Sequence, residues 1–251
     1  MSKWSYHPGD FTRCLISKTV QHEMRKVVVN DAQVLVHGPI QHGSLHAPLL
    51  ASFQQFRNQI YASTASYLMS SEQSSIEDRL ALEERSFHFY ATAGGELAAT
   101  VRVTAHPFEL AELAFDLKGV AQRYDRYLEL SRLLVDPRFQ KLGIGKKVLY
   151  SAMLWANLRE YLGFIAICRE HRKEEFERFG LRAFDDRKFV IPSRQNGEYR
   201  FMQGTWRMIV GGVAQTYAKK KLKTRIGKIL GKKEEPRWKM LNKESRTLTK
   251  S

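Results

Sequence analysis

Residues 128–158 constrain the fold of this chain more than any other part of the sequence. Residues 127–135 (YLELSRLLV) have the composition of a β-strand, and Asp136-Pro137 stops the run. A loop with Gly143 and Gly145 comes next, and apolar residues then recur at helical spacing as far as Leu158. A strand, a short glycine loop and a long helix in direct succession are typical of α/β proteins, so we expect a sheet covered by helices.

Apolar periodicity and turn residues indicate further helices and strands. Gly94-Gly95 is placed to join two strands into a hairpin, and Asn30-Asp31 to turn a shorter one. The continuous apolar run at 164–168 is typical of a fully buried strand, whereas the glycines and prolines at 38–48 predict a loop. Helices are predicted at 49–61, 76–85, 110–124, 148–158 and 172–179, and strands at 87–91, 96–104, 127–135, 164–168, 188–191 and 199–210.

Length and composition limit the class of protein. The chain has 251 residues, 43% of them hydrophobic and 27% charged, which suits one or two folded domains and excludes wholesale disorder. No segment approaches the roughly 20 apolar residues of a membrane span, and no leader pattern is visible. Because Cys14 and Cys168 are far apart, we expect a cytoplasmic protein without a disulfide framework. His37, His42 and His46 lack the spacing and fourth ligand of a zinc site, so no metal is predicted.

The glycine loop has the chemistry of a phosphate site. Gly143 and Gly145 let the backbone turn closely, so that the amides of residues 140–146 converge at the positive end of the following helix dipole. A GxG before a helix is by itself often only turn geometry. Val148 stands where the dinucleotide fingerprint needs a third glycine, so that fingerprint is absent. Countercharge is available from Lys141, Lys146 and Lys147.

The full arrangement is more specific than the glycines alone. Gln140, Gly143 and Gly145, after a strand that ends in Val-Asp-Pro, closely resemble the acyl-CoA pyrophosphate loop of the GNAT superfamily of acyltransferases. The order of elements also matches over roughly 50–210. The resemblance implies an α/β, GNAT-like fold with a mixed central sheet flanked by helices, and an acyl thioester donor rather than a permanently bound cofactor. The donor-binding residues that it implies are Leu133, Val135, Gln140, Lys141, Leu142, Gly143, Ile144, Gly145 and Lys146.

One position departs from that family's pattern. Many members carry a tyrosine four residues before the glycine of the short helix, where it protonates the departing thiolate. This chain has Phe176 there, and a phenyl ring has no proton to donate. Water, another side chain or the solvation of the thiol must then serve instead.

A narrower resemblance concerns the substrate. Glu129-Leu130-Ser131-Arg132 is similar to the Glu-x-Ser/Thr-Arg strand of acyl-homoserine-lactone synthases and of long-chain N-acyl amino acid synthases, which take acyl groups from acyl carrier protein. The resemblance implies catalytic roles for Glu129, Arg132 and Arg102: Glu129 is placed to accept the amine proton, directly or through water, and either Arg102 or Arg132 is suited to clamp a substrate carboxylate. Arg102 in the hairpin also matches the family. Arg57 and Tyr61 in the first helix match as well. The resemblance implies that these two residues and Ser131 contact the substrate.

Two observations qualify the narrower resemblance. Lactone synthases have a tryptophan and paired acids between helix and hairpin; this chain has acids there but no tryptophan between Trp4 and Trp155, which favours the amino-acid-acylating branch. In a regular strand Glu129 and Ser131 share one face and Arg132 faces the other, so only one set lines the cleft unless a bulge intervenes. A structural alternative is that Glu129, Arg102 and Arg132 form a buried ion-pair network. The acids in the interval are Glu77, Asp78, Glu83 and Glu84.

The C-terminal residues hold most of the positive charge. The chain's net charge is +15, and residues 217–251 contain 13 basic and 3 acidic side chains. Leu222, Ile226 and Ile229 recur at helical spacing among lysines, which predicts a basic amphipathic helix. Such a helix is suited to binding acidic acyl carrier protein or the anionic inner face of a membrane. Alternatively, its narrow apolar stripe packs on the domain. No nucleic-acid-binding motif is present in the sequence.

The sequence therefore predicts an N-terminal extension (1–47), a GNAT-like acyltransferase domain (48–216) and a basic C-terminal tail (217–251). The expected function is acyl transfer from acyl carrier protein or acyl-CoA to the amine of an amino acid or similar small molecule. The alternatives are an acetyl-CoA-dependent N-acetyltransferase of a small amine, and a catalytically degenerate binding module that its basic tail recruits to membrane or nucleic acid.

Overall fold

The computed structural model describes residues 28–29, 32–41, 43, 46–64, 82–113, 119, 122–191 and 197–229. The strands are β1 (Val28–Val29), β2 (Ala32–Gln41), β3 (Ser86–Ala93), β4 (Glu96–Thr104), β5 (Leu128–Val135), β6 (Gly163–Arg169), β7 (Arg182–Ala183), β8 (Phe189–Val190) and β9 (Glu198–Thr205). The helices are α2 (Ala47–Thr64), α4 (Glu109–Leu113), α6 (Ile144–Leu158), α7 (Lys173–Arg178) and α8 (Trp206–Ile229), with short 3₁₀ turns at Gln122–Tyr124, Pro137–Phe139 and Glu170–Arg172.

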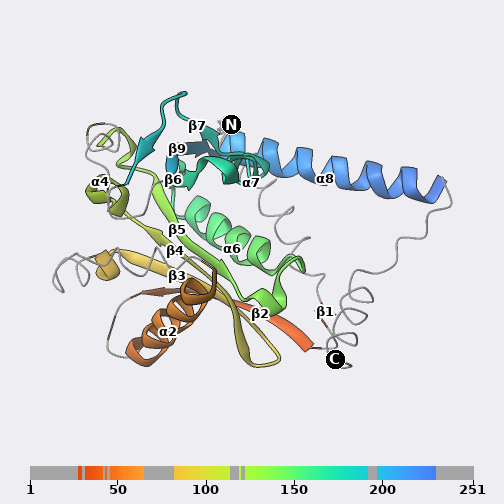
Figure 1. The fold of residues 1–251 in the computed structure, drawn as a ribbon, viewed down its shortest axis with the longest axis horizontal. Coiled ribbons are helices and arrows are strands. Elements are labelled where there is room, and N and C mark those ends of the chain that lie inside the picture. Colours follow the sequence, from red (N-terminus) through yellow and green to blue (C-terminus); the bar gives the residue numbers. More distant parts are fainter. Residues whose placement is uncertain are drawn as a thin grey trace, which may run out of the picture.

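The strands of the described residues form one nine-stranded sheet in the order β1-β2-β3-β4-β5-β6-β9-β7, with β8 paired to β9 (Figure 1). Neighbouring strands are antiparallel, apart from β5 and β6, which are parallel. The sheet is therefore mixed, as the sequence predicted. The hairpin of β3 and β4 around Gly94-Gly95 and the pairing of β1 with β2 through Val29 and Ala32 are also confirmed.

Helix α6 covers one face of the sheet, against β2, β3, β4 and β5. Its apolar side is almost completely buried, which is worth about 1.5–3 kcal/mol for each large side chain. In β3 the alternating residues Phe87 and Phe89 contact Trp155 of α6, with ring centroids 4.5 and 5.7 Å away. The buried residues of α6 in this core are Ile144, Val148, Leu149, Tyr150, Ala152, Met153 and Ala156.

Helix α2 lies on the opposite face, as its contact with the other set of β3 side chains shows. Phe53 of α2 packs against His88 and Tyr90, with ring centroids 5.7 and 5.1 Å apart. Because consecutive strand residues point to opposite faces, His88 and Tyr90 face α2 while Phe87 and Phe89 face α6. The sheet thus separates an α6 side from an α2 side.

Two sequence predictions were wrong at element boundaries. The loop expected at 38–48 is strand as far as Gln41, because Ile40 and Gln41 pair with β3 after an irregularity that absorbs Gly38 and Pro39. The strand expected at 199–210 ends at Thr205, whose hydroxyl accepts the Met208 N–H at 3.4 Å, as a helix N-cap does. Of the helix expected at 110–124, α4 ends at Leu113, and residues 114–118 lie outside the described part.

Helix α8 starts on the domain and continues across residue 217, where the sequence places the start of the tail. Trp206 Nε1 donates to the carbonyl of Tyr161, and Thr216 donates to the carbonyl of Arg178 at 3.0 Å. Beyond Thr216 the helix projects away from the sheet (Figure 1), and Leu222 is 59% exposed. Among the described helices, none combines the length and apolar character that crossing a membrane requires. The tail after Ile229 lies outside the described residues.

Candidate active site

A β-bulge in β5 brings side chains from both of its faces to the α2 side. Thr100 pairs with Leu134 and Arg102 pairs with Ser131, so two residues of β5, at 132 and 133, oppose the single residue Val101 of β4. Arg132 has a left-handed backbone with φ 54°, which is uncommon for a non-glycine residue and typical of a bulge. The bulge lets Arg132 join Glu129 and Ser131 on one side of the sheet.

The strands β5 and β6 part after two pairs of residues. They pair only at Leu128 with Phe164 and at Glu129 with Ile165, among the residues that the structure describes. The rest of β5, including Leu133 and Val135, therefore runs beyond the ladder with β6. Beyond this fork, β5 continues to Val135 and leads into the glycine loop.

The glycine loop leads tightly into α6. Gly143 precedes the helix with φ 81°, a backbone that glycine adopts freely, and no side chain caps the helix start. A Cβ on Gly145 would lie 2.8 Å from Val135 Cγ2, so glycine lets the first turn of α6 pack on the end of β5. Ile144 is 1% exposed and belongs to the core, so only its backbone faces the loop. Gln140, Lys141 and Lys146 are exposed, and Leu142 is half-buried.

Arg102 is the centre of a buried network of charges on the α2 side. Its side chain is 2% exposed, and each nitrogen of its guanidinium has a partner. Nε donates to Ser131 Oγ at 3.2 Å, Nη1 donates to Glu83 Oε1 at 2.9 Å, and Nη2 donates to Glu109. Glu109 in turn accepts from Arg132 Nη2 at 2.6 Å. Two carboxylates thus hold two arginines from neighbouring strands.

Glu83 is fixed in the same network by a histidine. His88 Nε2 lies 2.7 Å from Glu83 Oε2. Burial alone would raise the pKa of Glu83, but the hydrogen bond to His88 and the charge of Arg102 lower that pKa to about 2. Glu83 is therefore ionised at neutral pH.

Glu129 differs from the other two carboxylates. Its Oε2 accepts the Leu110 N–H at 3.1 Å, and it has no ion pair within 4 Å among the described residues. Burial and the negative charge of Glu109 raise the pKa of Glu129 to about 7, against the lowering effect of Arg102. The carboxyl thus exchanges its proton near neutrality, which is the property of a general acid or base.

Helix α2 adds two residues to this cluster. Arg57 and Tyr61 are one helical turn apart, so they lie on the same face of α2. Tyr61 lies close to Arg132 and helps to raise the pKa of its guanidinium. Burial lowers the pKa of Arg57, and the positive charges of Arg132 and Arg102 lower it further, as expected for guanidinium groups held close together. The predicted residues brought together here are Arg57, Tyr61, Arg102, Glu129, Ser131 and Arg132.

The sequence profile of the family described as "N-acyl amino acid synthase FeeM" matches residues 52–189, which include α2, the hairpin, the bulged strand and the glycine loop. The chain belongs to the FeeM family. It is therefore an N-acyltransferase. Among curated proteins, no sequence matches the chain.

Solved structures share the fold of this FeeM-family chain. FeeM from uncultured soil microbes, an N-acyl amino acid synthase, has a TM-score of 0.54 at 8% identity, over 71% of this chain and 95% of FeeM. The CoA-dependent acyl-homoserine lactone synthase BjaI has a TM-score of 0.56 at 12% identity, over 74% and 89% of the two chains. A second such synthase, MesI, has a TM-score of 0.55 at 14% identity, over 74% and 95%. The predicted GNAT-like fold is confirmed.

The sequence did not predict three residues of the cluster as site residues. They are Glu83, His88 and Glu109. Glu83 was one of four acids noted between helix and hairpin; Glu77 and Asp78 lie outside the described residues. Charge balance was the available signal, since three arginines that share a buried site need more than the one carboxylate of Glu129. Glu109 follows Pro107 closely at a helix start, where acids are favoured.

Phe176, which replaces the usual tyrosine, lies on α7 and packs against the main core. Its ring fills space and has no exchangeable proton. The thiol of Cys168, buried in β6, is not a substitute acid, because burial and the charge of Glu170 raise its pKa to about 12. The described part of this FeeM-family chain thus holds no tyrosine-like acid at that position.

Proposed function

We propose that this chain transfers an acyl group from acyl carrier protein or acyl-CoA to the amine of an amino acid or a similar small molecule. One observation carries the proposal: the buried Glu129 carboxyl, with its pKa near 7, lies among arginines at the fork between β5 and β6. A base with this pKa can accept a proton at neutral pH, and the arginines provide charge for a carboxylate beside the reacting amine.

In the proposed reaction the amine nitrogen bonds to the thioester carbonyl carbon, and the carbon–sulfur bond breaks. Glu129, directly or through one water, accepts the proton that the amine loses. Backbone N–H groups of Leu133 and Val135 polarise the carbonyl, and a donor of this kind lowers the barrier by about 3–4 kcal/mol. The departing thiolate takes its proton from water, since Phe176 has none to give.

The arginines have different proposed roles. Arg102 is fully engaged with Ser131, Glu83 and Glu109, so we assign it to positioning the network. The side chain of Arg132 is 18% exposed, and its buried Nε has no hydrogen-bond partner among the described residues. A substrate carboxylate would satisfy that donor, with Arg57 and Tyr61 of α2 beside it. An amino acid is therefore favoured over a simple amine.

The donor is proposed to bind by its phosphate at the glycine loop. Both CoA and the prosthetic arm of acyl carrier protein carry phosphate, so residues 140–146 serve either donor. Acyl carrier protein is strongly acidic and gains more from the basic residues of 217–251, of which those up to Ile229 lie on α8, a helix that projects from the domain. The same helix is suited to peripheral contact with an anionic membrane at its cytoplasmic face.

The test is amide formation by the full chain with each class of donor. Long-chain acyl carrier protein, long-chain acyl-CoA and acetyl-CoA are each offered with single amino acids and with the matching amino alcohols, and products are measured by mass spectrometry. We expect N-acyl amino acids from a long-chain donor and at least about tenfold less product from the amino alcohols. Turnover of acetyl-CoA with amines that lack a carboxylate, and of no long-chain donor, would contradict the proposal. Vesicles with and without anionic lipid test membrane contact in a sedimentation assay.

A further inference from the structure

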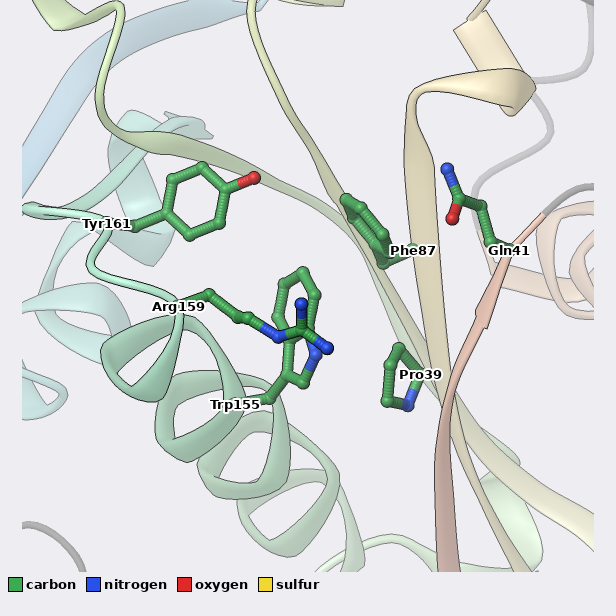
Figure 2. Close-up of a pocket in the computed structure, with 6 residues that line it drawn as sticks. All are labelled: Pro39, Gln41, Phe87, Trp155, Arg159 and Tyr161. Atoms are coloured by element: carbon green, nitrogen blue, oxygen red, sulfur yellow. The ribbon is translucent and has the colours of Figure 1, made fainter.

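A pocket lies on the α6 side of the sheet, away from the candidate active site. It has a volume of about 450 Å³, within the range of small-molecule sites. Figure 2 shows it between the C-terminal end of α6 and the strands β2 and β3. The lining residues are Pro39, Gln41, Phe87, Trp155, Arg159 and Tyr161.

Two facts separate this pocket from the site of acyl transfer. Phe87 lines the pocket, while the next residue, His88, faces α2 and bonds Glu83 in the charge network. Trp155 is also eleven residues along α6 from Ile144, about 17 Å at 1.5 Å per residue. The pocket is thus on the other face of the sheet and near the other end of the helix.

The pocket's walls are aromatic. Trp155 lies 4.5 Å from Phe87 and 6.0 Å from Tyr161 between ring centroids, and its plane is inclined by only 33° to that of Tyr161. The Arg159 guanidinium carbon lies 6.0 Å from the centre of the Trp155 ring. Figure 2 shows that guanidinium lying across Trp155, with Pro39, Gln41 and Phe87 on the strand side. Flat apolar groups are the ligands that such walls bind best.

The polar atoms of the pocket are mostly donors. Trp155 Nε1 is buried and has no hydrogen-bond partner in the part of the chain that the structure describes. Arg159 is exposed and carries a full positive charge at the rim. Burial raises the pKa of Tyr161, against the charge of Arg159, so its hydroxyl stays protonated. Gln41 Nε2 already donates a hydrogen bond to the Glu84 carbonyl at 3.0 Å. The lining contains no carboxylate, so an anion meets donors and no repulsion.

We infer that this pocket binds an aromatic carboxylate: the ring packs against Phe87 and Trp155, and the carboxylate takes the donors of Arg159 and of Trp155 Nε1. This binding site is separate from acyl transfer and does not depend on the proposed function. Charge-assisted bonds from a guanidinium fix the orientation of such a ligand, and the aromatic walls provide most of the buried area.

Calorimetric titration of the full chain with 2-naphthoate tests the inference, with the neutral 2-naphthamide as the matched probe. We expect saturable binding of 2-naphthoate, at least about tenfold weaker binding of the amide, and no effect of saturating acyl-CoA. Arg159→Gln should weaken 2-naphthoate binding about tenfold or more. Trp155→Phe keeps a ring but removes the N–H, and should weaken binding several-fold.

Arg187→Gln is the control, because Arg187 is exposed and pairs only with its neighbour Asp185 in the ion pairs of the described residues. It should bind 2-naphthoate as the unchanged protein does. The inference is overturned by absence of saturable binding, by equal affinity for naphthoate and naphthamide, by full affinity in Arg159→Gln, or by displacement with acyl-CoA.

Discussion

Arg132 Nη2 lies 2.6 Å from Glu109 Oε1, and both side chains are largely buried. Glu109 also accepts from Arg102, so one carboxylate compensates guanidinium groups from two neighbouring strands. Removing one partner of such a set leaves an uncompensated buried charge. We expect Glu109→Gln to lower the free energy of unfolding by about 3–5 kcal/mol in urea denaturation.

The matched control for that prediction is Glu198→Gln. Glu198 pairs with Lys188 at 2.7 Å on the surface, and exposed pairs are worth about 0–1 kcal/mol. A loss in Glu109→Gln no larger than the loss in Glu198→Gln would show that the buried network does not carry the stability assigned to it.

The rate of acyl transfer should depend on pH through Glu129. The pKa of this carboxyl is raised to about 7, and only its ionised form accepts a proton. We therefore expect kcat at saturating amine to rise between pH 6 and 8, with its midpoint near 7. A profile that is flat over this range, with an acid limb only near pH 4.5, would exclude Glu129 as the base.

The free energy of unfolding should depend on pH through the same carboxyl, but in the opposite direction to the rate. Because folding raises the pKa of Glu129 from 4.5 to about 7, its contribution to stability is fully present below pH 4.5 and is lost as pH rises through 7. Glu129→Gln never ionises and can still accept the Leu110 N–H. Its stability relative to the unchanged chain should increase from pH 5 to 8, by at most about 3 kcal/mol. A difference that does not change with pH would contradict the raised pKa.

Substitutions of the two loop glycines should impair the protein for different reasons. Gly143 has a left-handed φ of 81° but open space around its Cβ position, so Gly143→Val strains the backbone and should weaken donor binding at least about tenfold. Gly143→Asn, which tolerates this φ, is the matched control and should bind nearly normally. Gly145→Ala places a methyl group 2.8 Å from Val135 Cγ2 and should also lower stability. Calorimetric donor affinity and urea denaturation separate the two effects; normal donor affinity in Gly143→Val would remove the loop from donor binding.

Donor preference should depend on the basic helix. Replacing Lys219, Lys220, Lys221 and Lys223 by glutamine leaves the domain contact of Thr216 in place. We expect kcat/KM with acyl carrier protein to fall and to lose most of its salt dependence, while kcat/KM with acyl-CoA stays nearly unchanged. Deleting 217–251 should have the same effect. Lys173→Gln and Lys188→Gln, on the domain surface, are controls. Equal loss with both donors would show that the helix does not recruit carrier protein.

The sequence was sufficient for most of the described elements, but not for all of their boundaries and not for the strand registers. The turn at Gly94-Gly95 predicts a hairpin, yet a regular ladder through it would pair His88 with Val101. The observed irregularity after Ala91 pairs His88 with Arg102 instead. No local pattern marks the extra residue at this position, because both strands are apolar and buried on either side. The partner of Arg102 therefore could not be derived.

The bulge at Arg132 is likewise a feature that the alternation of residues in β5 does not predict. Strict alternation puts Arg132 opposite to Glu129 and Ser131, whereas its left-handed backbone brings all three to the α2 side. The resemblance of the motif to known synthases groups these residues, whereas periodicity alone separates them. Glu109 was beyond local reasoning, since only packing of α4 on the sheet brings its carboxylate to the arginines.

The most direct measurement of the central claim is kcat of Glu129→Gln per folded molecule, in the formation of an N-acyl amino acid at pH 7.5. The substitution keeps the size of the side chain and removes only its ability to accept the amine proton. If Glu129 is the base, kcat falls by about 10²–10⁴ while the chain stays as stable as before or more so. Unchanged kcat per folded molecule together with a lower melting temperature would contradict this account and leave Glu129 as a structural part of the buried network.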